Sequence, residues 1–299
     1  MATETTLGEK PEFAPLVDRY RRDGYVHVPG VLTREEVDIF GAAVDHAVAV
    51  RKQGDDRSLE EKTPYEQSFI QCQYLWEDFP EVRPLTFHPV VCALAAGLIG
   101  APTIRLWHDQ ALYKEAGGRE TEAHQDQPYW PIAETATVTA WIPFVQTDET
   151  SGMMGYVPGS QHGEASFVDI FSSPGAGKAL EAKQTKAPVF VPCQRGDVVF
   201  HSGLTVHMAK ANRSEHTRRV YTVIYLADGL HRESERPHPS VDRDAIGPGE
   251  VIAGRATPIA WPLAGGAFPE PAPWPPWPAE NAERRERLLR LGIIPVQPR

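Results

Sequence analysis

Residues 136–144 read ATVTAWIPF and carry the clearest two-residue period in the chain. In an extended strand, successive side chains point to opposite faces of the sheet. One face of this segment is entirely apolar and consists of Val138, Ala140, Ile142 and Phe144. The opposite face combines polar and aromatic residues, namely Thr137, Thr139 and Trp141. The pattern predicts a β-strand over these residues.

Several other short segments have strand character and lie on both sides of this one. They are residues 104–113, 189–191, 197–201 and 219–226. Turn sequences separate them: Gly117-Gly118, Ser151-Gly152, Pro158-Gly159-Ser160 and Arg195-Gly196-Asp197. Many short strands divided by such turns favour a β-sandwich or a barrel.

The N-terminal third of the chain has helical patterns instead. Helices are predicted over 13–23, 33–51 and 80–99, with a strand at 24–28 and a charged loop at 52–66. Thr33 followed by Glu36 forms a capping box, which marks the start of the second helix. We expect a mainly β fold with helices packed against the outside of its core.

The chain is predicted to divide into three parts. Residues 1–12 are expected to be disordered, and residues 13–265 to form a single domain with helices in 13–99 and a β core in 103–228. Residues 266–299 form a tail with a short helix at 281–291. Its segment PEPAPWPPWPAE, residues 269–280, suits neither a helix nor a central strand. Either it wraps the domain, with Trp274 and Trp277 against the surface, or it is a linker.

Composition narrows the classes of partner. The chain has 299 residues and a net charge of −10, which argues against nucleic acid because phosphates require a basic face. No segment approaches the length of a transmembrane helix, and no signal peptide precedes the domain, so we expect no membrane association. Cys72, Cys92 and Cys193 match neither a disulfide framework nor a zinc site. These features predict a cytoplasmic protein.

A histidine and an aspartate stand two residues apart in EAHQDQPYW, residues 122–130. On a strand, His124 and Asp126 would point to the same face and could share a metal ion. An imidazole with a carboxylate suits Fe(II), Mn or Zn. Alone, the pair is equally compatible with a polar surface turn.

A second segment, residues 196–225, supplies the parts that a complete site would need. It contains His201 and His207, followed by Arg218 and Arg219 at the start of a strand. Three protein ligands on one face of an iron leave three positions open, and a dicarboxylate can chelate two of them. Its distal carboxylate then needs a buried cation, for which the forked guanidinium of arginine is suited. The strand period allows only one of the two arginines to face inward.

Five pieces of the chain resemble the phytanoyl-CoA dioxygenase-like family of Fe(II)/2-oxoglutarate-dependent oxygenases. They are RDGYVHVPGVLTREEVD, FIQCQYLWEDFPEVRPLTFHP, LWHDQALYKEAGGRETEAHQDQPYW, TAWIPFVQTDETSGMMGYVPGSQHG and GDVVFHSGLTVHMAKANRSEHTRR, all within residues 15–265. The resemblance implies a double-stranded β-helix, or jelly-roll, core. It assigns His124, Asp126 and His207 as iron ligands and leaves His201 in a supporting position. It selects Arg218 over Arg219 for the 2-oxoglutarate carboxylate.

The resemblance also identifies residues around the cosubstrate. Trp141 matches a tryptophan beside it, and Gln71 and Gln125 are weaker candidates for contacting it. Family members often have a serine two residues after the distal histidine, where this chain has Ala209. The lost hydroxyl removes a hydrogen bond worth roughly 0.5–1.5 kcal/mol. Candidate substrate-binding residues are Trp107, Gln127, Tyr129 and Trp130.

The implied function is a dioxygenase that uses Fe(II), 2-oxoglutarate and O₂. It would hydroxylate an unactivated C–H of a small-molecule metabolite and release succinate and CO₂. Asp126 argues against a halogenating relative, which would need a small residue there. Two alternatives stay open on the residues alone: a zinc-dependent hydrolase on the same His/Asp/His set, and a non-catalytic jelly-roll binding protein.

Overall fold

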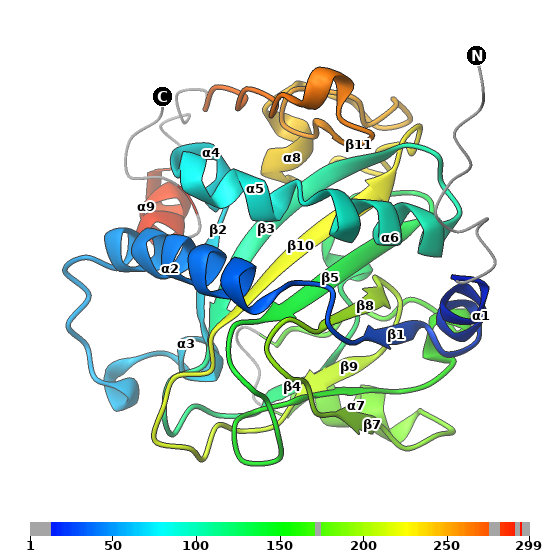
Figure 1. The fold of residues 1–299 in the computed structure, drawn as a ribbon. Helices are drawn as coiled ribbons and strands as arrows, with labels where there is room; N and C mark the ends of the chain where they lie inside the picture. Colours follow the sequence, from blue (N-terminus) through cyan, green and yellow to red (C-terminus); the bar gives the residue numbers. More distant parts are fainter. Residues whose placement is uncertain (1–12, 171–174, 275–281, 291–293, 295–299) are drawn as a thin grey trace.

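The computed structural model describes residues 13–170, 175–274, 282–290 and 294 and consists of two antiparallel sheets with flanking helices (Figure 1). In strand order, the large sheet comprises β1 (Tyr25–Val28), β8 (Val198–Ser202), β5 (Thr137–Pro143), β10 (Val220–Ala227), β3 (Ile104–Tyr113) and β11 (Ile259–Trp261). Strand β2 (Ile70–Gln73) also pairs with β3. The small sheet comprises β4 (Thr121–His124), β9 (His207–Ala209), β6 (Met154–Tyr156) and β7 (Val189–Val191). This arrangement confirms the predicted jelly-roll core.

Strand β5 lies inside the large sheet, between β8 and β10. Its two faces meet different surroundings, as the period predicts. The apolar face joins the main hydrophobic core through Val138, Ala140, Ile142 and the following Phe144. The opposite face contributes Thr139 and Trp141 to a cavity. One strand therefore connects the hydrophobic core to the cavity.

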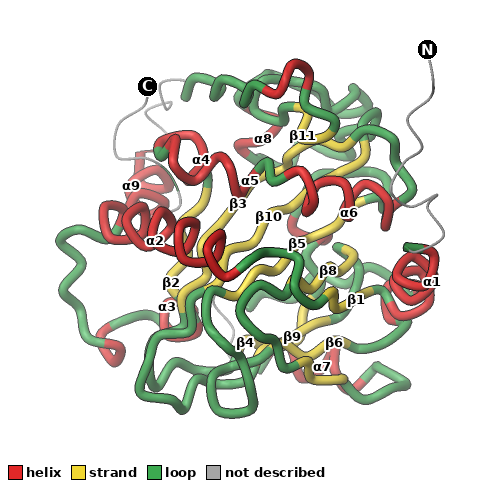
Figure 2. Tube along the Cα trace, viewed as in Figure 1, coloured by secondary structure: helices red, strands yellow, loops and turns green. Residues whose placement is uncertain are grey.

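Helices cover the outer face of the large sheet (Figure 2). They include α2 (Arg34–Arg51), which begins with the predicted capping box, and α6 (Pro89–Ile99), while α1 (Ala14–Asp23) packs beside β1. The predicted helix 80–99 is interrupted, since η3 (Pro80–Val82) and α5 (Arg83–Thr86) precede α6. Pro89 disfavours a helical conformation at His88, which caps α6 instead. Among the described residues no single helix could span a membrane, although the bent pair Pro80–Thr86 and Pro89–Ile99 passes on length and composition together.

Some short elements escaped prediction. The expected loop 52–66 contains η2 (Leu59–Glu61) and the start of α3 (Pro64–Ser68), and each opens with a capping box. Strands of three or four residues, such as β2, β4, β6 and β9, show too little of a period to be recognised. The same holds for three short helices, which are α4 (Leu75–Asp78), α7 (Ala176–Ala182) and α8 (Pro239–Asp242).

The tail is attached to the domain through Trp274. Its indole Nε1 donates to Glu77 Oε2 at 3.0 Å, and the Arg243 guanidinium lies 4.2 Å from its ring centroid. Arg243 in turn forms a two-pronged ion pair with Glu77 at 2.7 and 2.9 Å. We call these three side chains the tail clamp. The expected helix is present as α9 (Ala282–Arg290), whereas residues 1–12 and Trp277 lie outside the described residues. The division into domain and tail stays a prediction.

Candidate functional site

Three potential metal ligands converge where β4 meets β9. His124 ends β4 and His207 begins β9, and the two residues are direct partners across the strand pair. Their Nε2 atoms lie 3.7 and 3.6 Å from Oδ1 of Asp126. One ligand atom from each residue lies within 4.8 Å of the others. Residues up to 83 positions apart in sequence, from 124 to 207, thus form a compact set of two nitrogens and one oxygen.

The expectation that His124 and Asp126 share one strand is wrong. Strand β4 ends at His124, and Asp126 has helical dihedral angles (φ −76°, ψ −44°) at the start of η4 (Gln127–Tyr129). Pro128 at the second position of that turn favours the helical conformation. The side chains converge because the chain turns after the strand. The intervening Gln125 is directed elsewhere, with its amide bonded to Leu204 O at 2.7 Å and Ser166 N at 2.8 Å.

Both imidazoles are held in one tautomer. Nδ1 of His124 donates to Glu122 O at 2.7 Å, and Nδ1 of His207 donates to Thr205 O at 2.9 Å. Since a carbonyl can only accept, each Nδ1 carries the proton and each Nε2 keeps its lone pair. Burial lowers the pKa of His124 and of His207 to about 4. Both rings are therefore neutral at pH 7, as a metal ligand must be.

Asp126 supplies the negative charge of the group. Burial would raise the pKa of Asp126, but the histidines at 207, 201 and 124 outweigh it and hold the pKa below its usual value. Its Oδ2 is 3.3 Å from both Thr139 Oγ1 and His201 Nε2. Two neutral imidazoles with one carboxylate on one side of a cavity fit Fe(II), which uses this donor set with open positions opposite.

The group opens into a cavity with an empty volume of about 930 Å³, its open mouth included. Strands of both sheets contribute to its wall, including β3, β5 and β10 from the large sheet and β9 from the small one. Arg218 and Trp141 lie in the same wall.

Arg218 is a buried cation in this cavity, with 2 % of its surface exposed. Its Nη1 donates to Gly152 O at 2.8 Å, and its guanidinium lies 5.7 Å from the Trp141 ring centroid. Nε has no hydrogen-bond partner in the described structure. Burial lowers the pKa of Arg218 to about 10, so the group stays charged at pH 7. Arg219 instead pairs with Asp45 outside the cavity lining, which agrees with the choice of Arg218.

Two residues near Arg218 were missed by sequence reasoning. Thr121 lines the cavity directly across the strand pair from Ala209. Lys114 is completely buried and its Nζ lies 3.2 Å from the Thr121 hydroxyl. Within the described residues, neither Lys114 nor Arg218 has a carboxylate within 4.0 Å, although buried charges are normally paired. The sequence signal for a buried lysine was the position of Lys114 at the end of the alternating stretch ALYK, residues 111–114.

The other predicted site residues separate into two groups. Tyr129, Trp130 and Gln71 line the cavity, and the Gln71 amide is already bonded to Gln110 and Tyr65. Trp107 and Gln127 do not line it. Trp107 packs in the main core, and Gln127 is bonded to Glu134 O and to the Thr137 hydroxyl. These two are therefore structural in the described molecule.

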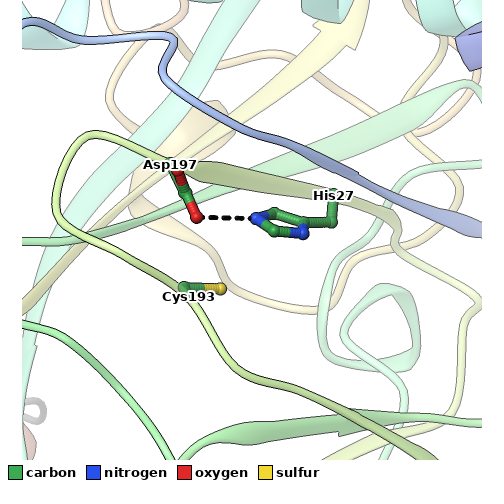
Figure 3. Close-up of side chains that lie close together, drawn as sticks. All are labelled: His27, Cys193 and Asp197. Carbon is green, nitrogen blue, oxygen red and sulfur yellow. Dashed lines mark hydrogen bonds and ion pairs between the residues drawn. The ribbon is translucent and has the colours of Figure 1, made fainter.

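A second group of potential ligands occurs at the edge of the large sheet, as Figure 3 shows for His27, Cys193 and Asp197. Nε2 of His27 is 2.8 Å from Asp197 Oδ2. The Asp197 carboxylate also accepts the amides of Gly30 at 3.0 Å and Gln194 at 2.8 Å. The Cys193 thiol packs in a hydrophobic cluster, and burial raises its pKa to about 12. These contacts describe a cross-link that fastens β1 to the turn before β8.

Comparisons with known proteins agree with this geometry. The family model for phytanoyl-CoA dioxygenase matches residues 20–220. The chain is 24 % identical to a methylphosphonate hydroxylase of Gimesia maris over 73 % of this chain and 82 % of that protein. It is 23 % identical to the human peroxisomal phytanoyl-CoA dioxygenase, over 67 % of this chain and 60 % of that enzyme.

Two solved structures are similar over nearly their whole length. One is SnoK, a non-heme α-ketoglutarate-dependent carbocyclase from nogalamycin biosynthesis, with 29 % identity, a TM-score of 0.69, and coverage of 86 % of this chain and 99 % of SnoK. The other is the epimerase SnoN in complex with Fe³⁺, α-ketoglutarate and nogalamycin RO, with 28 % identity, a TM-score of 0.64, and coverage of 83 % and 98 %.

Proposed function

Because the chain belongs to the phytanoyl-CoA dioxygenase family, we propose that His124, Asp126 and His207 hold its catalytic iron. The chain is an Fe(II)- and 2-oxoglutarate-dependent oxygenase. When iron and 2-oxoglutarate are bound, such a site couples decarboxylation of 2-oxoglutarate to substrate oxidation by O₂. The observation that carries the assignment is the convergence of two neutral Nε2 atoms and one carboxylate in a cavity that also contains a buried arginine.

Arg218 binds the distal carboxylate of 2-oxoglutarate in this proposal. The support is that Arg218 is a buried cation in the cavity wall with no carboxylate within 4.0 Å among the described residues, and a carboxylate would balance its charge. Trp141 packs beside the guanidinium and restricts its orientation. Thr121 supplies the hydroxyl that Ala209 lacks, since the two positions face each other across β4 and β9.

The substrate is a small molecule that enters the same cavity, and the reaction is hydroxylation of an unactivated C–H. Supporting residues have separate tasks. Thr139 and His201 orient Asp126, while Tyr129 and Trp130 form part of the apolar wall that keeps water away. We also propose that the protein works in the cytoplasm without nucleic acid or membrane, since its net charge is −10 and its three cysteines are free.

The test measures succinate released in air by the iron-loaded protein, with and without 2-oxoglutarate. We expect 2-oxoglutarate-dependent succinate formation that Asp126→Ala abolishes. The matched control is Asp197→Ala, which alters the second group and leaves the cavity unchanged. Absence of both 2-oxoglutarate binding and succinate in the iron-loaded wild type would reject the proposal.

A further inference from the structure

The wall of the cavity carries very little charge. Asp126 and Arg218 are its only aspartate, glutamate, lysine or arginine side chains among the described residues. The proposed function uses both, one for the metal and one for 2-oxoglutarate. The rest of the wall, which we call the substrate wall, therefore has no fixed charge to offer a substrate. Its polar members that matter here are Gln73, His108, Gln110 and His238.

The histidines of the substrate wall do not change this conclusion. Nδ1 of His238 accepts the backbone amide of Ser240 at 3.2 Å, so this nitrogen holds a lone pair and the ring is neutral. The ring is fixed by stacking on Trp107, at 4.3 Å between centroids. His108 is 3 % exposed, and burial lowers its pKa to about 4. Both rings are thus uncharged hydrogen-bonding groups at pH 7.

An amide cluster on β2 and β3 provides further hydrogen-bonding groups. Gln110 Oε1 accepts from Gln71 Nε2 at 2.6 Å and from Gln73 Nε2 at 3.3 Å, and Tyr65 donates to Gln71 Oε1 at 2.5 Å. These contacts use both ends of the Gln71 amide. They leave the NH₂ group of Gln110 and the carbonyl of Gln73 without protein partners in the described structure. His108 Nδ1 is likewise buried without a partner. The NH₂ group of Gln110 and the carbonyl of Gln73 therefore remain to recognise a ligand, whereas the buried His108 Nδ1 is out of its reach.

Aromatic side chains make up much of the remaining surface. Phe69, Tyr129 and Trp130 all line the cavity. Tyr129 is held against Phe167 by an edge contact of 5.2 Å between ring centroids, and Trp130 lies edge-on to His108 at 6.3 Å. Ring faces of this kind favour a flat or cyclic apolar skeleton.

We propose that this cavity takes an uncharged cyclic compound whose hydroxyl or carbonyl oxygens bind Gln73 and Gln110. A carboxylate, phosphate, phosphonate or ammonium group of the substrate would have to enter without a counter-charge, which is strongly unfavourable. This inference rests on the proposed function, because it assigns the two charged side chains to iron and 2-oxoglutarate. It extends that function by restricting the substrate class.

The experiment uses the full chain loaded with Fe(II) and 2-oxoglutarate under argon, and three probes. Methyl 2-naphthoate is neutral, 2-naphthoate has the same skeleton with a negative charge, and methylphosphonate is a small anion. Isothermal titration calorimetry gives the dissociation constant of each. We expect the ester to bind at least tenfold more tightly than the naphthoate and methylphosphonate to give no binding. Equal or tighter binding of either anion, or no binding of the ester, would overturn the inference.

The second measurement asks whether a positive charge added to the cavity reverses its preference for the neutral ester. Gln110→Lys should tighten 2-naphthoate by tenfold or more relative to the ester, whereas Gln194→Lys, on an exposed side chain outside the cavity, should leave the ratio unchanged. If Gln110→Lys no longer binds 2-oxoglutarate, the measurement is made with Gln73→Lys as the cavity variant instead. An unchanged ratio in both cavity variants counts against the inference. Titrating 2-oxoglutarate alone first separates the two failures, because loss of that binding rejects the proposed function instead.

Discussion

The groups His124/Asp126/His207 and His27/Cys193/Asp197 contain similar residue types at similar distances, with their potential ligand atoms within 4.8 Å in each case. Their carboxylates differ. Among the described residues, the Asp126 carboxylate has side-chain neighbours alone, at 3.3 Å or more. The Asp197 carboxylate instead accepts hydrogen bonds from two backbone amides and lies 2.8 Å from His27, so its contacts span 2.8–3.0 Å. The first group opens into a cavity, and the second joins two pieces of backbone. Proximity alone therefore does not identify a metal site. The lone pairs must also remain available.

The largest effect is expected for Asp126→Ala. Removal of the only carboxylate in the triad should weaken iron binding on the order of 100-fold or more and abolish succinate formation. Metal content after dialysis and succinate release measure the two effects. If iron binding survives, Asp126 is not a ligand and the contrast between the two groups loses its basis.

Arg218→Ala comes next. Loss of charge-assisted hydrogen bonds worth about 1.5–3 kcal/mol should weaken 2-oxoglutarate binding by roughly 10- to 150-fold. Arg219→Ala is the matched control, because its exposed pair with Asp45 contributes about 0–1 kcal/mol to stability and lies outside the cavity lining. Anaerobic calorimetry of 2-oxoglutarate compares them. A larger loss for Arg219→Ala would reverse the assignment.

Asp197→Ala should act on stability and leave the cavity intact. Removing the carboxylate strands the amides of Gly30 and Gln194, and we expect the free energy of unfolding to fall by about 2–4 kcal/mol. Denaturant titration measures this change. The dissociation constant of 2-oxoglutarate should stay within about twofold of wild type, and a parallel loss of iron would show that the second group binds metal.

Relocating a hydroxyl tests the Thr121 assignment with a smaller effect. Thr121→Val should weaken 2-oxoglutarate binding by about 2- to 10-fold, the value of one hydrogen bond, whereas Thr121→Ser should not. Adding Ala209→Ser to Thr121→Val should restore binding, because it returns a hydroxyl to the facing position. Wild-type binding of 2-oxoglutarate by Thr121→Val would exclude a role for the Thr121 hydroxyl.

The smallest effect is expected for Cys193→Ser. The rise in Tm that Fe(II) produces should be the same in this variant as in the wild type, and it should vanish in Asp126→Ala. Thermal unfolding with and without Fe(II) provides the comparison. A metal-induced shift that persists in Asp126→Ala and disappears on adding Cys193→Ser would make both groups metal sites.

The sequence predicted the long elements and the main site residues, for different reasons. Strand β5 and helix α2 have enough length for a period and a capping box to be visible. The two-residue spacing suggested His124 and Asp126 as a pair, whereas the third ligand His207 and the choice of Arg218 came from a family resemblance, since their meeting depends on strand pairings that no local pattern contains. The position of Asp126 after the strand, rather than on it, required the three-dimensional structure.

Other residues could not be assigned because their surroundings come from distant segments. Lys114 is buried by distant segments that include Gly152 and Asn212, and Thr121 gained meaning only through its pairing with Ala209. Trp107 and Gln127 are of types that line pockets, yet their neighbours place them in supporting positions. Such differences follow from tertiary packing, which residue type does not encode.

The tail clamp has a consequence for the order in which the molecule is assembled. Arg243 immediately follows α8. In that helix the Ser240 hydroxyl donates to Trp107 O, and the Ser240 backbone amide donates to Nδ1 of His238. Trp274 reaches Glu77 across 197 positions, so this contact forms only after residue 274 has been synthesised. The proposed metal ligands His124, Asp126 and His207 and the residue Arg218 all precede it in the sequence. The residues of the cavity wall are thus synthesised before Trp274 is available to join Glu77 and Arg243.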